Sequence, residues 1–349
     1  MNFKIGNVQV GDEAPCFIIA ELSANHNQRL DVALETVRAA KAAGADCIKL
    51  QHYKADTITI DCGNKYFQIN QGTLWDGTTL YKLYQEAFMP WEWTPEIMKA
   101  ANAEGLLCFS SPFDFTAVDF LEQHDVPAYK IASFEITDIP LIAYVAAKGK
   151  PVIISTGIAG LEDIELAIKT CREAGNDQIA LLKCTSSYPA ALDEVNLKTI
   201  PDMMRKYKAV IGLSDHTIGV SVPVASVALG AKIIEKHFIL DKNLGGPDAS
   251  FSLEPAEFKL MVDSVRDVEK SLGTISYELS PKVLKSREFS RSLFIVKDVM
   301  AGEAFTVENV RSIRPGFGLH PKHLNEIMGK KAIAAFEKGT PFTWEMIQP

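Results

Sequence analysis

Residues 209–238 read AVIGLSDHTIGVSVPVASVALGAKIIEKHF. Two apolar runs rich in β-branched residues, 209–214 and 231–238, flank a stretch whose apolar residues recur with helical spacing. A helix of that length can cross back over a sheet, which makes the strands on either side of it parallel. The segment therefore predicts a strand–helix–strand unit with His216 and His237 at the carboxyl ends of its two strands.

The same alternation of strand and helix continues along most of the chain. Apolar runs lie at 17–22, 47–51, 106–111, 128–133, 151–156, 179–184, 209–214 and 231–238, and helical stretches lie near 30–43, 95–104, 116–123, 139–148, 161–174, 196–207, 221–229 and 256–271. Eight such units close a parallel barrel, and a doubly wound open sheet is the alternative for this pattern. Nearly every run ends in polar residues, which only a barrel brings to one mouth. We therefore predict an α/β fold with a (β/α)8 TIM barrel.

The remaining segments do not follow this rhythm. Residues 1–15 predict a small hairpin that plugs the bottom of the barrel, and the long connection 52–94 predicts a helical insertion over the mouth. That insertion either packs as a surface segment or shapes the substrate site. We expect the barrel domain to span 1–280, a linker to span 281–292, and a small domain of short strands and Gly turns to span 293–349.

Composition excludes several classes of protein. The 349 residues are 47% apolar and 23% charged, as expected for a folded globular chain. The 44 acidic and 36 basic residues are spread without a basic block, so nucleic acid is not an expected partner. Six cysteines without a CxxC pair indicate reduced thiols and a cytoplasmic protein. No apolar run reaches the ~18 residues of a membrane span and the N-terminus lacks a signal-peptide pattern, so neither a membrane nor export is expected.

The two histidines at the strand ends form a candidate metal pair. His216 and His237 would supply two ligands and leave positions open for water or substrate, as a catalytic metal requires. A single histidine at a strand end is more often a hydrogen-bonded structural residue, so spacing alone leaves both interpretations open.

Charged residues inside apolar strands form a second candidate group. Lys49 and Lys130 could bind phosphate and carboxylate groups, form structural ion pairs with glutamates, or serve as a Schiff-base lysine. Glu21 could be a general base or the salt-bridge partner of a lysine. These alternatives stay open on the residues alone.

A series of motifs runs in order through the predicted barrel: IIAELSANHN (18–27), IKLQ (48–51), FSSPFD (109–114), YKIAS (129–133), STG (155–157), KCTSSYP (183–189), GLSDHT (212–217), EKHF (235–238) and GPDASFSL (246–253). Together they resemble the sialic acid synthase family of nonulosonic acid synthases. The later segment VRSIRPGFGL (310–319) is similar to the antifreeze-like (SAF, β-clip) C-terminal domain of that family.

The resemblance implies an enzyme that condenses phosphoenolpyruvate with an N-acetylated amino sugar. His216 and His237 would hold Mn²⁺ or Mg²⁺, and Glu21 would act as base or hold the reacting water. Arg314 would reach the mouth of a partner subunit, which implies a domain-swapped homodimer. The substrate-binding residues implied are Lys49, Gln51, Asn70, Ser111, Lys130, Ser133, Glu135, Ser155, Ser186, Tyr188, Ser214, Asp248 and Arg314.

Departures from the family pattern bear on the acceptor sugar. Neuraminic acid synthases usually read YKIGSGE where this chain has Ala132 and Phe134, and often carry Asn where it has Ser186. An aromatic residue there favours a 6-deoxy sugar, whose methyl group suits an apolar wall. The resemblance thus favours 2,4-diacetamido-2,4,6-trideoxy-altrose as acceptor, with neuraminate or legionaminate synthesis as the alternative.

Two other classes of protein remain possible on the residues alone. A metal-free aldolase would form a Schiff base on Lys49 or Lys130. In a sugar-binding protein without catalytic activity, His216 would take part in no chemical step.

Overall fold

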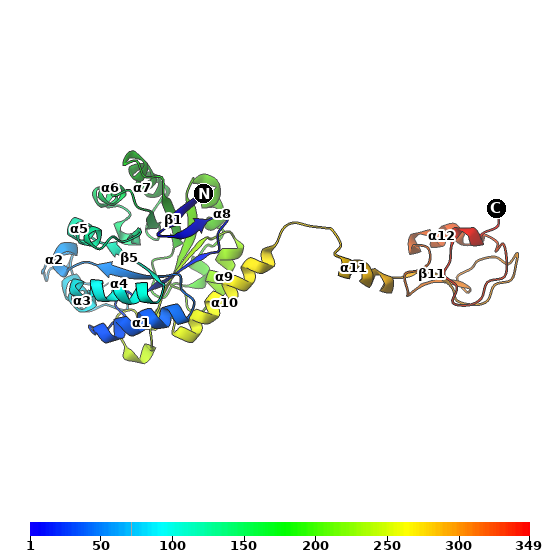
Figure 1. Cartoon of the computed structure of the whole chain (residues 1–349), viewed down its shortest axis with the longest axis horizontal. Coiled ribbons are helices and arrows are strands. Elements are labelled where there is room, and N and C mark those ends of the chain that lie inside the picture. The colour runs from blue at the N-terminus through cyan, green and yellow to red at the C-terminus, as the bar shows by residue number, and fades with distance from the viewer. Residues whose placement is uncertain (71) are drawn as a thin grey trace. The chain divides into compact units, whose positions relative to one another are not determined.

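Eight parallel strands form a closed barrel in the order β10-β3-β4-β5-β6-β7-β8-β9, which confirms the predicted TIM-barrel fold. The computed structural model describes residues 1–70 and 72–349 and divides into two compact units, Met1–Gly273 and Thr274–Pro349. Figure 1 shows the barrel of the first unit with its helices around the strands.

The elements alternate as the sequence predicts. The barrel strands are β3 (Phe17–Glu21), β4 (Cys47–His52), β5 (Leu107–Pro112), β6 (Tyr129–Ile131), β7 (Val152–Ser155), β8 (Ile179–Cys184), β9 (Val210–Asp215) and β10 (Ile233–His237). The helices that follow them are α1 (Leu30–Ala42), α4 (Thr94–Ala103), α5 (Phe115–Gln123), α6 (Ile139–Ala146), α7 (Leu161–Glu173), α8 (Thr199–Lys206), α9 (Ser221–Ala228) and α10 (Pro255–Leu272).

The outer helices bury one apolar face each. In α10 the buried residues Phe258, Met261, Val262 and Val265 follow the i, i+3, i+4, i+7 spacing of a helix face. Pro255 occupies its first turn, where a missing N–H breaks no helical hydrogen bond. None of the described helices is long and apolar enough to cross a membrane.

The strand register brings chemically active residues to one level of the barrel. Glu21 on β3 is in register with Lys49 on β4 and with His237 on β10. Residues in register on parallel strands point to the same side of the sheet, so these three side chains share the inner face. They come from the carboxyl ends of their strands, where barrel enzymes place their active sites.

A two-stranded hairpin lies at the opposite end of the barrel. It pairs β1 (Asn2–Ile5) with β2 (Val8–Gly11) and buries Phe3, Ile5 and Val10 in the barrel core. Its turn residue Gly6 has φ +57°, and a Cβ there would lie 3.1 Å from a Leu107 methyl at the start of β5. The hairpin therefore packs at the amino-terminal ends of the strands.

The insertion between β4 and β5 is largely helical. It contains α2 (Ala55–Ile58), α3 (Leu80–Ala87) and the 3₁₀ turn Trp91–Trp93. Trp91 Nε1 donates a hydrogen bond to the Tyr53 carbonyl at 3.2 Å. This bond fastens the end of the insertion to the residue that follows β4.

The second unit has its own small core. Strands β11 (Ser292–Ile295) and β12 (Val310–Ile313) pair antiparallel, and the short helix α12 (Leu324–Ile327) follows them. The core contains Leu293, Ile295, Val299, Phe305, Val310, Ile327, Ala332, Phe342 and Met346. Helix α11 (Pro281–Ser286) lies within the segment predicted as a linker.

Candidate active site

A chain of alternating charges lines the carboxyl end of the barrel. Lys49 Nζ lies 2.6 Å from Glu21 Oε2 and 3.8 Å from Glu235 Oε2. Lys130 Nζ lies 3.6 Å from Glu235 Oε1 and donates a hydrogen bond to Ser155 Oγ at 2.7 Å. None of these residues is more than 5% exposed, so each charge depends on its neighbours for stabilisation.

The two carboxyl groups of this chain are shifted in opposite directions. Burial raises the pKa of Glu21 above its ordinary range, although Lys49 opposes the shift. Burial would also raise the pKa of Glu235, but Lys130 and Lys49 together hold it below its ordinary value. Such a pair provides one permanent anion and one carboxyl group able to exchange a proton near neutral pH.

A cradle of hydroxyl groups lies beside Lys130. The backbone N–H of Gly157 donates to Ser133 Oγ at 3.2 Å. A Cβ at position 157 would lie 2.0 Å from Ser186 Oγ and 2.7 Å from Ser133 Oγ, so only glycine allows this approach. Ser155, two residues before Gly157, accepts the hydrogen bond from Lys130. Hydroxyl and backbone donors next to an ammonium group suit a phosphate.

The two predicted metal ligands lie together at the mouth. The rings of His216 and His237 have centroids 5.3 Å apart, and the ring of Tyr188 lies 4.3 Å from that of His216. His216 Nδ1 is 3.0 Å from the Thr185 carbonyl oxygen, which leaves Nε2 available. His237 Nδ1 has no hydrogen-bond partner among the described residues, and Asp248 Oδ2 is 3.9 Å away.

These two side chains fit a divalent ion. Burial lowers the pKa of His237 well below its usual value, which keeps the ring in the neutral form that binds metals. Within residues 1–70 and 72–349 no group of three His, Cys, Asp or Glu side chains has the arrangement of a metal site. The protein would therefore supply two ligands and leave the other positions to water or substrate.

Polar groups on the other side of Glu21 form a second network. Gln51 Nε2 donates to Glu21 Oε1 at 2.9 Å and to Ser23 Oγ at 3.1 Å, and Ser23 Oγ donates to Asp248. Glu135 Oε2 is buried without a hydrogen-bond partner in the described part of the chain. Burial raises the pKa of Glu135 to about 7. Gln51, Ser23 and Asp248 thus offer donors and acceptors for a sugar on this side of the mouth.

The insertion contributes to the same mouth. Trp75 Nε1 donates to the Pro247 carbonyl at 3.3 Å, and its ring lies 5.6 Å from that of Tyr188. Asn70, predicted to bind the sugar, is exposed on this insertion. Because Trp75 stacks beside the aromatic ring that touches His216, the contacts favour the substrate-shaping interpretation of the insertion.

The structure gathers most of the predicted residues but not all. Ser111 Oγ accepts a hydrogen bond from Lys49 at 3.2 Å, and Ser214 Oγ donates to Glu235 Oε1 at 3.1 Å, so both join the charge chain. Arg314 lies in the second unit, which is described by itself. The individual roles stay predictions.

Three residues that shape the site were not predicted from the sequence. Ser23 links Gln51 to Asp248, Gly157 closes the cradle, and Trp75 covers Tyr188. Gly157 had a signal, because it ends the STG motif directly after a strand. Ser23 and Trp75 had none, because their partners come from distant loops.

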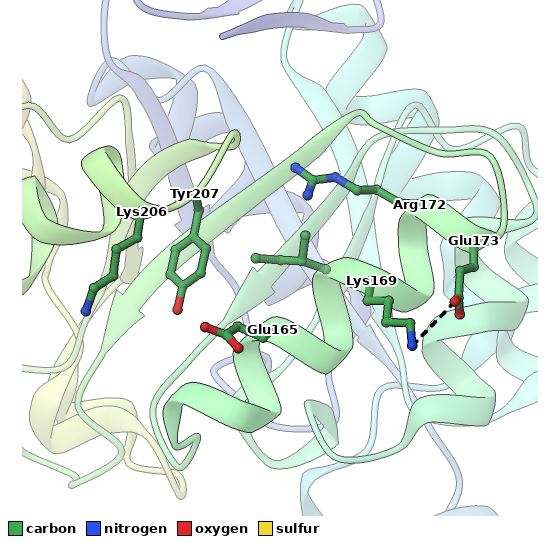
Figure 2. A pocket seen from close by; sticks show the side chains of 7 residues that line it. Glu165, Lys169, Arg172, Glu173, Lys206 and Tyr207 are labelled. Atoms are coloured by element: carbon green, nitrogen blue, oxygen red, sulfur yellow. Dashed lines mark ion pairs between the residues drawn. The ribbon is translucent and has the colours of Figure 1, made fainter.

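A separate surface depression of about 500 Å³ lies between α7 and α8 (Figure 2). It is lined by Glu165, Ile168, Lys169, Arg172, Glu173, Lys206 and Tyr207. Its cations already have acidic partners: Lys169 lies 3.6 Å from Glu173, Arg172 3.3 Å from Asp177 and Lys206 2.8 Å from Asp202. It belongs to the helix layer and lacks the groups gathered at the mouth.

The fold and the mouth define a (β/α)8-barrel protein with a buried, charged site at its strand ends. The chain belongs to the NeuB family, whose model matches residues 36–277, and a SAF domain matches residues 290–348. The predicted family and the SAF domain are thereby confirmed.

Similar proteins cover nearly the whole chain. Pseudaminic acid synthase from Campylobacter jejuni is 49% identical over 94% of this chain and 95% of its own length. Pseudaminic acid synthase from Helicobacter pylori is 44% identical over 96% and 98%. The solved structure of the spore coat polysaccharide biosynthesis protein SpsE from Bacillus subtilis is 36% identical, covers 100% of this chain and 99% of its own, and has a TM-score of 0.69.

Proposed function

We propose that this chain carries out the pseudaminic acid synthase reaction. It would condense phosphoenolpyruvate with 2,4-diacetamido-2,4,6-trideoxy-β-L-altropyranose and water, giving pseudaminic acid and phosphate. The observation that carries the proposal is the buried chain of Glu21, Lys49, Glu235 and Lys130 beside the His216–His237 pair. The Campylobacter and Helicobacter relatives of that name support the acceptor.

The two substrates would bind on different sides of the mouth. Lys130 and the cradle of Ser133, Ser155 and Gly157 bind the phosphate, and Lys49 pairs with the carboxylate of the same substrate. Gln51 and Asp248 hold the open-chain sugar on the other side. The two substrates are thus oriented so that the enol carbon of phosphoenolpyruvate faces the sugar aldehyde carbon.

The same residues can stabilise the charges that develop during the reaction. When the enol carbon bonds to the aldehyde carbon, positive character develops at the carbon that carries phosphate, and the Glu235 carboxylate stabilises it. Glu21 takes a proton from the water that adds to this carbon and passes it to the former aldehyde oxygen. The carbon–oxygen bond to phosphate then breaks as the added hydroxyl group becomes the keto oxygen, and the proton of that hydroxyl leaves with the phosphate, which stays paired with Lys130. A divalent ion such as Mn²⁺ or Mg²⁺ held by His216 and His237 would act as a Lewis acid on the aldehyde.

The proposal includes an assembly and a compartment. A homodimer in which the second unit exchanges between subunits would bring Arg314 to a partner's mouth, where its guanidinium could contact an acetamido group. The six cysteines are unpaired within the described residues, which supports a reducing compartment such as the cytoplasm.

The deciding experiment measures phosphate release from phosphoenolpyruvate with Mn²⁺. The diacetamido-trideoxy-altrose and N-acetylmannosamine are compared, with a reaction lacking acceptor as control. Release with the first sugar alone is expected. Release with N-acetylmannosamine alone would keep the family chemistry and overturn the acceptor, and equal use of both would remove the claim of selectivity.

The Schiff-base alternative is tested in the same samples. Borohydride added in the presence of substrate traps a covalent adduct on Lys49 or Lys130 if a Schiff base forms. We expect no adduct and loss of activity with a chelator. A trapped adduct with chelator-resistant activity would replace the proposed mechanism.

A further inference from the structure

One buried ion pair lies directly behind the active site and has no role in the chemistry described above. Lys236 Nζ lies 2.5 Å from Asp215 Oδ2, and the two residues are 0% and 3% exposed. Lys236 also donates to the carbonyl oxygen of Thr217. These contacts place an ammonium group in the packed layer between strands and helices.

The strand register puts this ion pair between two pairs of active-site residues. On β9 and β10, Ser214 is in register with Glu235 and Asp215 with Lys236. Successive side chains of a strand point to opposite faces, so Ser214 and Glu235 face the interior while Asp215 and Lys236 face the helices. His216 directly follows Asp215, and His237 directly follows Lys236. Both histidines face the interior again, as the contact between their rings indicates.

The same ion pair holds the backbone on both sides of His216. Asp215 Oδ1 accepts hydrogen bonds from Thr217 N at 3.1 Å and Thr217 Oγ1 at 2.9 Å. Thr217, 1% exposed, therefore bonds Asp215 through its own donors and Lys236 through its carbonyl oxygen. Lys236 is adjacent to His237 in the chain, so a single ammonium group ties the turn that carries His216 to the strand that carries His237.

We propose that the Lys236–Asp215 ion pair is a positioning device that fixes the separation of His216 and His237 and thereby sets the affinity for a divalent metal ion. The inference rests on the metal site of the proposed function and assigns its control to residues that touch neither the metal nor the substrate. Partners behind metal ligands commonly tune affinity in this way.

Stability alone is a weaker explanation for the pair. Two charges taken from water gain little over apolar residues of similar volume, although removal of one partner leaves a costly unpaired charge. A matched loss of both charges therefore separates the two roles. If the ion pair only supports the fold, the double replacement is harmless to the metal site.

The experiment compares Mn²⁺ affinity and thermal stability in the full-length protein. Lys236→Met with Asp215→Asn removes both charges, keeps side-chain length, and retains an oxygen for Thr217. Mn²⁺ binding is followed by the electron paramagnetic resonance signal of the free ion. We expect the double variant to fold and to bind Mn²⁺ about 10–100-fold more weakly than wild type. The single change Lys236→Met is expected to lose stability as well, because Asp215 is left unpaired.

A control comes from a partly exposed ion pair at the amino-terminal end of the barrel. Arg266 and Asp46 form an ion pair at 3.1 Å, and Asp46 also accepts a hydrogen bond from Ile18 N. The double variant Arg266→Met/Asp46→Asn should change stability without changing Mn²⁺ affinity. Equal weakening in both double variants would mean a general effect of lost ion pairs and would overturn the positioning role.

The remaining outcomes separate this inference from the proposed function. A folded Lys236→Met/Asp215→Asn protein that binds Mn²⁺ as tightly as wild type overturns the inference alone. Wild-type protein that binds no Mn²⁺ overturns the metal site itself, and the inference with it. If the double variant does not fold, Asp215→Asn alone decides, because it removes the anion of the ion pair and keeps the side-chain volume and an oxygen for Thr217. Unchanged Mn²⁺ affinity in that variant would also contradict the proposal.

Discussion

Histidines and lysines occur on both faces of the barrel strands, but their hydrogen-bond partners differ between the two faces. His52 on β4 faces the helices, and its ring nitrogens lie 2.7 Å from Ser110 Oγ and 2.8 Å from Thr94 Oγ1. His237 on β10 faces the interior, and its Nδ1 has no hydrogen-bond partner in the described part of the chain. Both rings are buried, so the difference lies in what surrounds them.

The lysines repeat this contrast. Lys236 on the outer face is enclosed by Asp215 and a carbonyl oxygen. Lys130 on the inner face lies 3.6 Å from Glu235, which it shares with Lys49 at 3.8 Å. His52 and Lys236 on the outer face thus have polar partners, whereas His237 on the inner face has a buried ring nitrogen without a partner among the described residues, at a cost in stability. The face of a strand therefore separates the two roles.

The largest expected effect comes from the inner histidine. His237→Ala should abolish measurable Mn²⁺ binding and lower phosphate release by about 10³-fold or more, since a Lewis acid contributes several kcal/mol to the barrier. Its thermal midpoint should fall modestly, because the ring contacts with His216 and Phe251 are lost although Nδ1 loses no hydrogen bond. Calorimetric Mn²⁺ titration and a phosphate assay measure both effects. Phosphate release at the wild-type rate would remove His237 from the site.

The next effect concerns the inner carboxyl group with the raised pKa. Glu21→Gln should lower kcat by about 10²–10⁴-fold, the usual contribution of a general base. Glu21 must be ionised to accept a proton, so the wild-type rate should rise with pH through its pKa, and this rise should vanish in the variant. Rates of phosphate release across pH 5–9 give the profile.

An outer carboxyl group supplies the control for Glu21. Glu122 accepts hydrogen bonds from Tyr129 and pairs with Lys150 at 2.9 Å on the helix side of β6. Glu122→Gln should leave kcat and its pH profile unchanged. If both variants lost activity alike, the contrast between the faces would fail.

Replacement of His52, the histidine on the outer face, should change the stability of the protein and leave its activity unchanged. Burial lowers the pKa of His52 from 6.5 to about 3, so between these pH values the unfolded chain binds a proton that the folded chain does not. Wild-type stability should then fall with decreasing pH in that window, by about 1.4 kcal/mol per pH unit at most.

The variant His52→Asn tests this at two pH values. It should lose about 1–3 kcal/mol at pH 7.5, because hydrogen bonds to Ser110 and Thr94 are weakened, and its deficit against wild type should shrink at pH 5. Urea unfolding measures the free energies. A deficit that grows on acidification would mean that His52 is not held neutral, and a loss of Mn²⁺ affinity would contradict its assignment to the fold.

Most of the fold could be predicted because its signals are local. Each strand is a short apolar run, and each helix is a stretch with helical periodicity. The alternation of strands and helices that forms the barrel can therefore be recognised in the sequence. The strand ends then indicated Glu21, Lys49, Lys130, His216 and His237 without any knowledge of loops. Period-2 alternation also separates Ser111, which accepts from Lys49, from Ser110, which faces His52.

The contacts between loops could not be predicted. Ser23, with φ +47°, reaches Asp248, which is 225 residues away in the chain, and Trp75 reaches Pro247, which is 172 residues away. No pattern in a single sequence encodes such pairs, because they depend on how the barrel mouth is closed. The place of Arg314 at a partner's mouth rests on the family resemblance and stays a prediction.

The smallest expected effect concerns the choice of acceptor sugar, and it is tested by replacing one exposed phenylalanine at the mouth and another on a helix. Phe134 follows β6 at the carboxyl end and is 58% exposed, so Phe134→Ala should cost little stability. Loss of an apolar wall for the sugar methyl group should lower kcat/KM for the diacetamido-trideoxy-altrose about tenfold, the usual worth of one methyl contact. The KM for phosphoenolpyruvate should stay constant. Phe115→Ala on α5, 48% exposed, is the matched control and should change neither value. Equal losses in both variants, or an unchanged preference over N-acetylmannosamine in Phe134→Ala, would assign acceptor choice to other residues of the mouth.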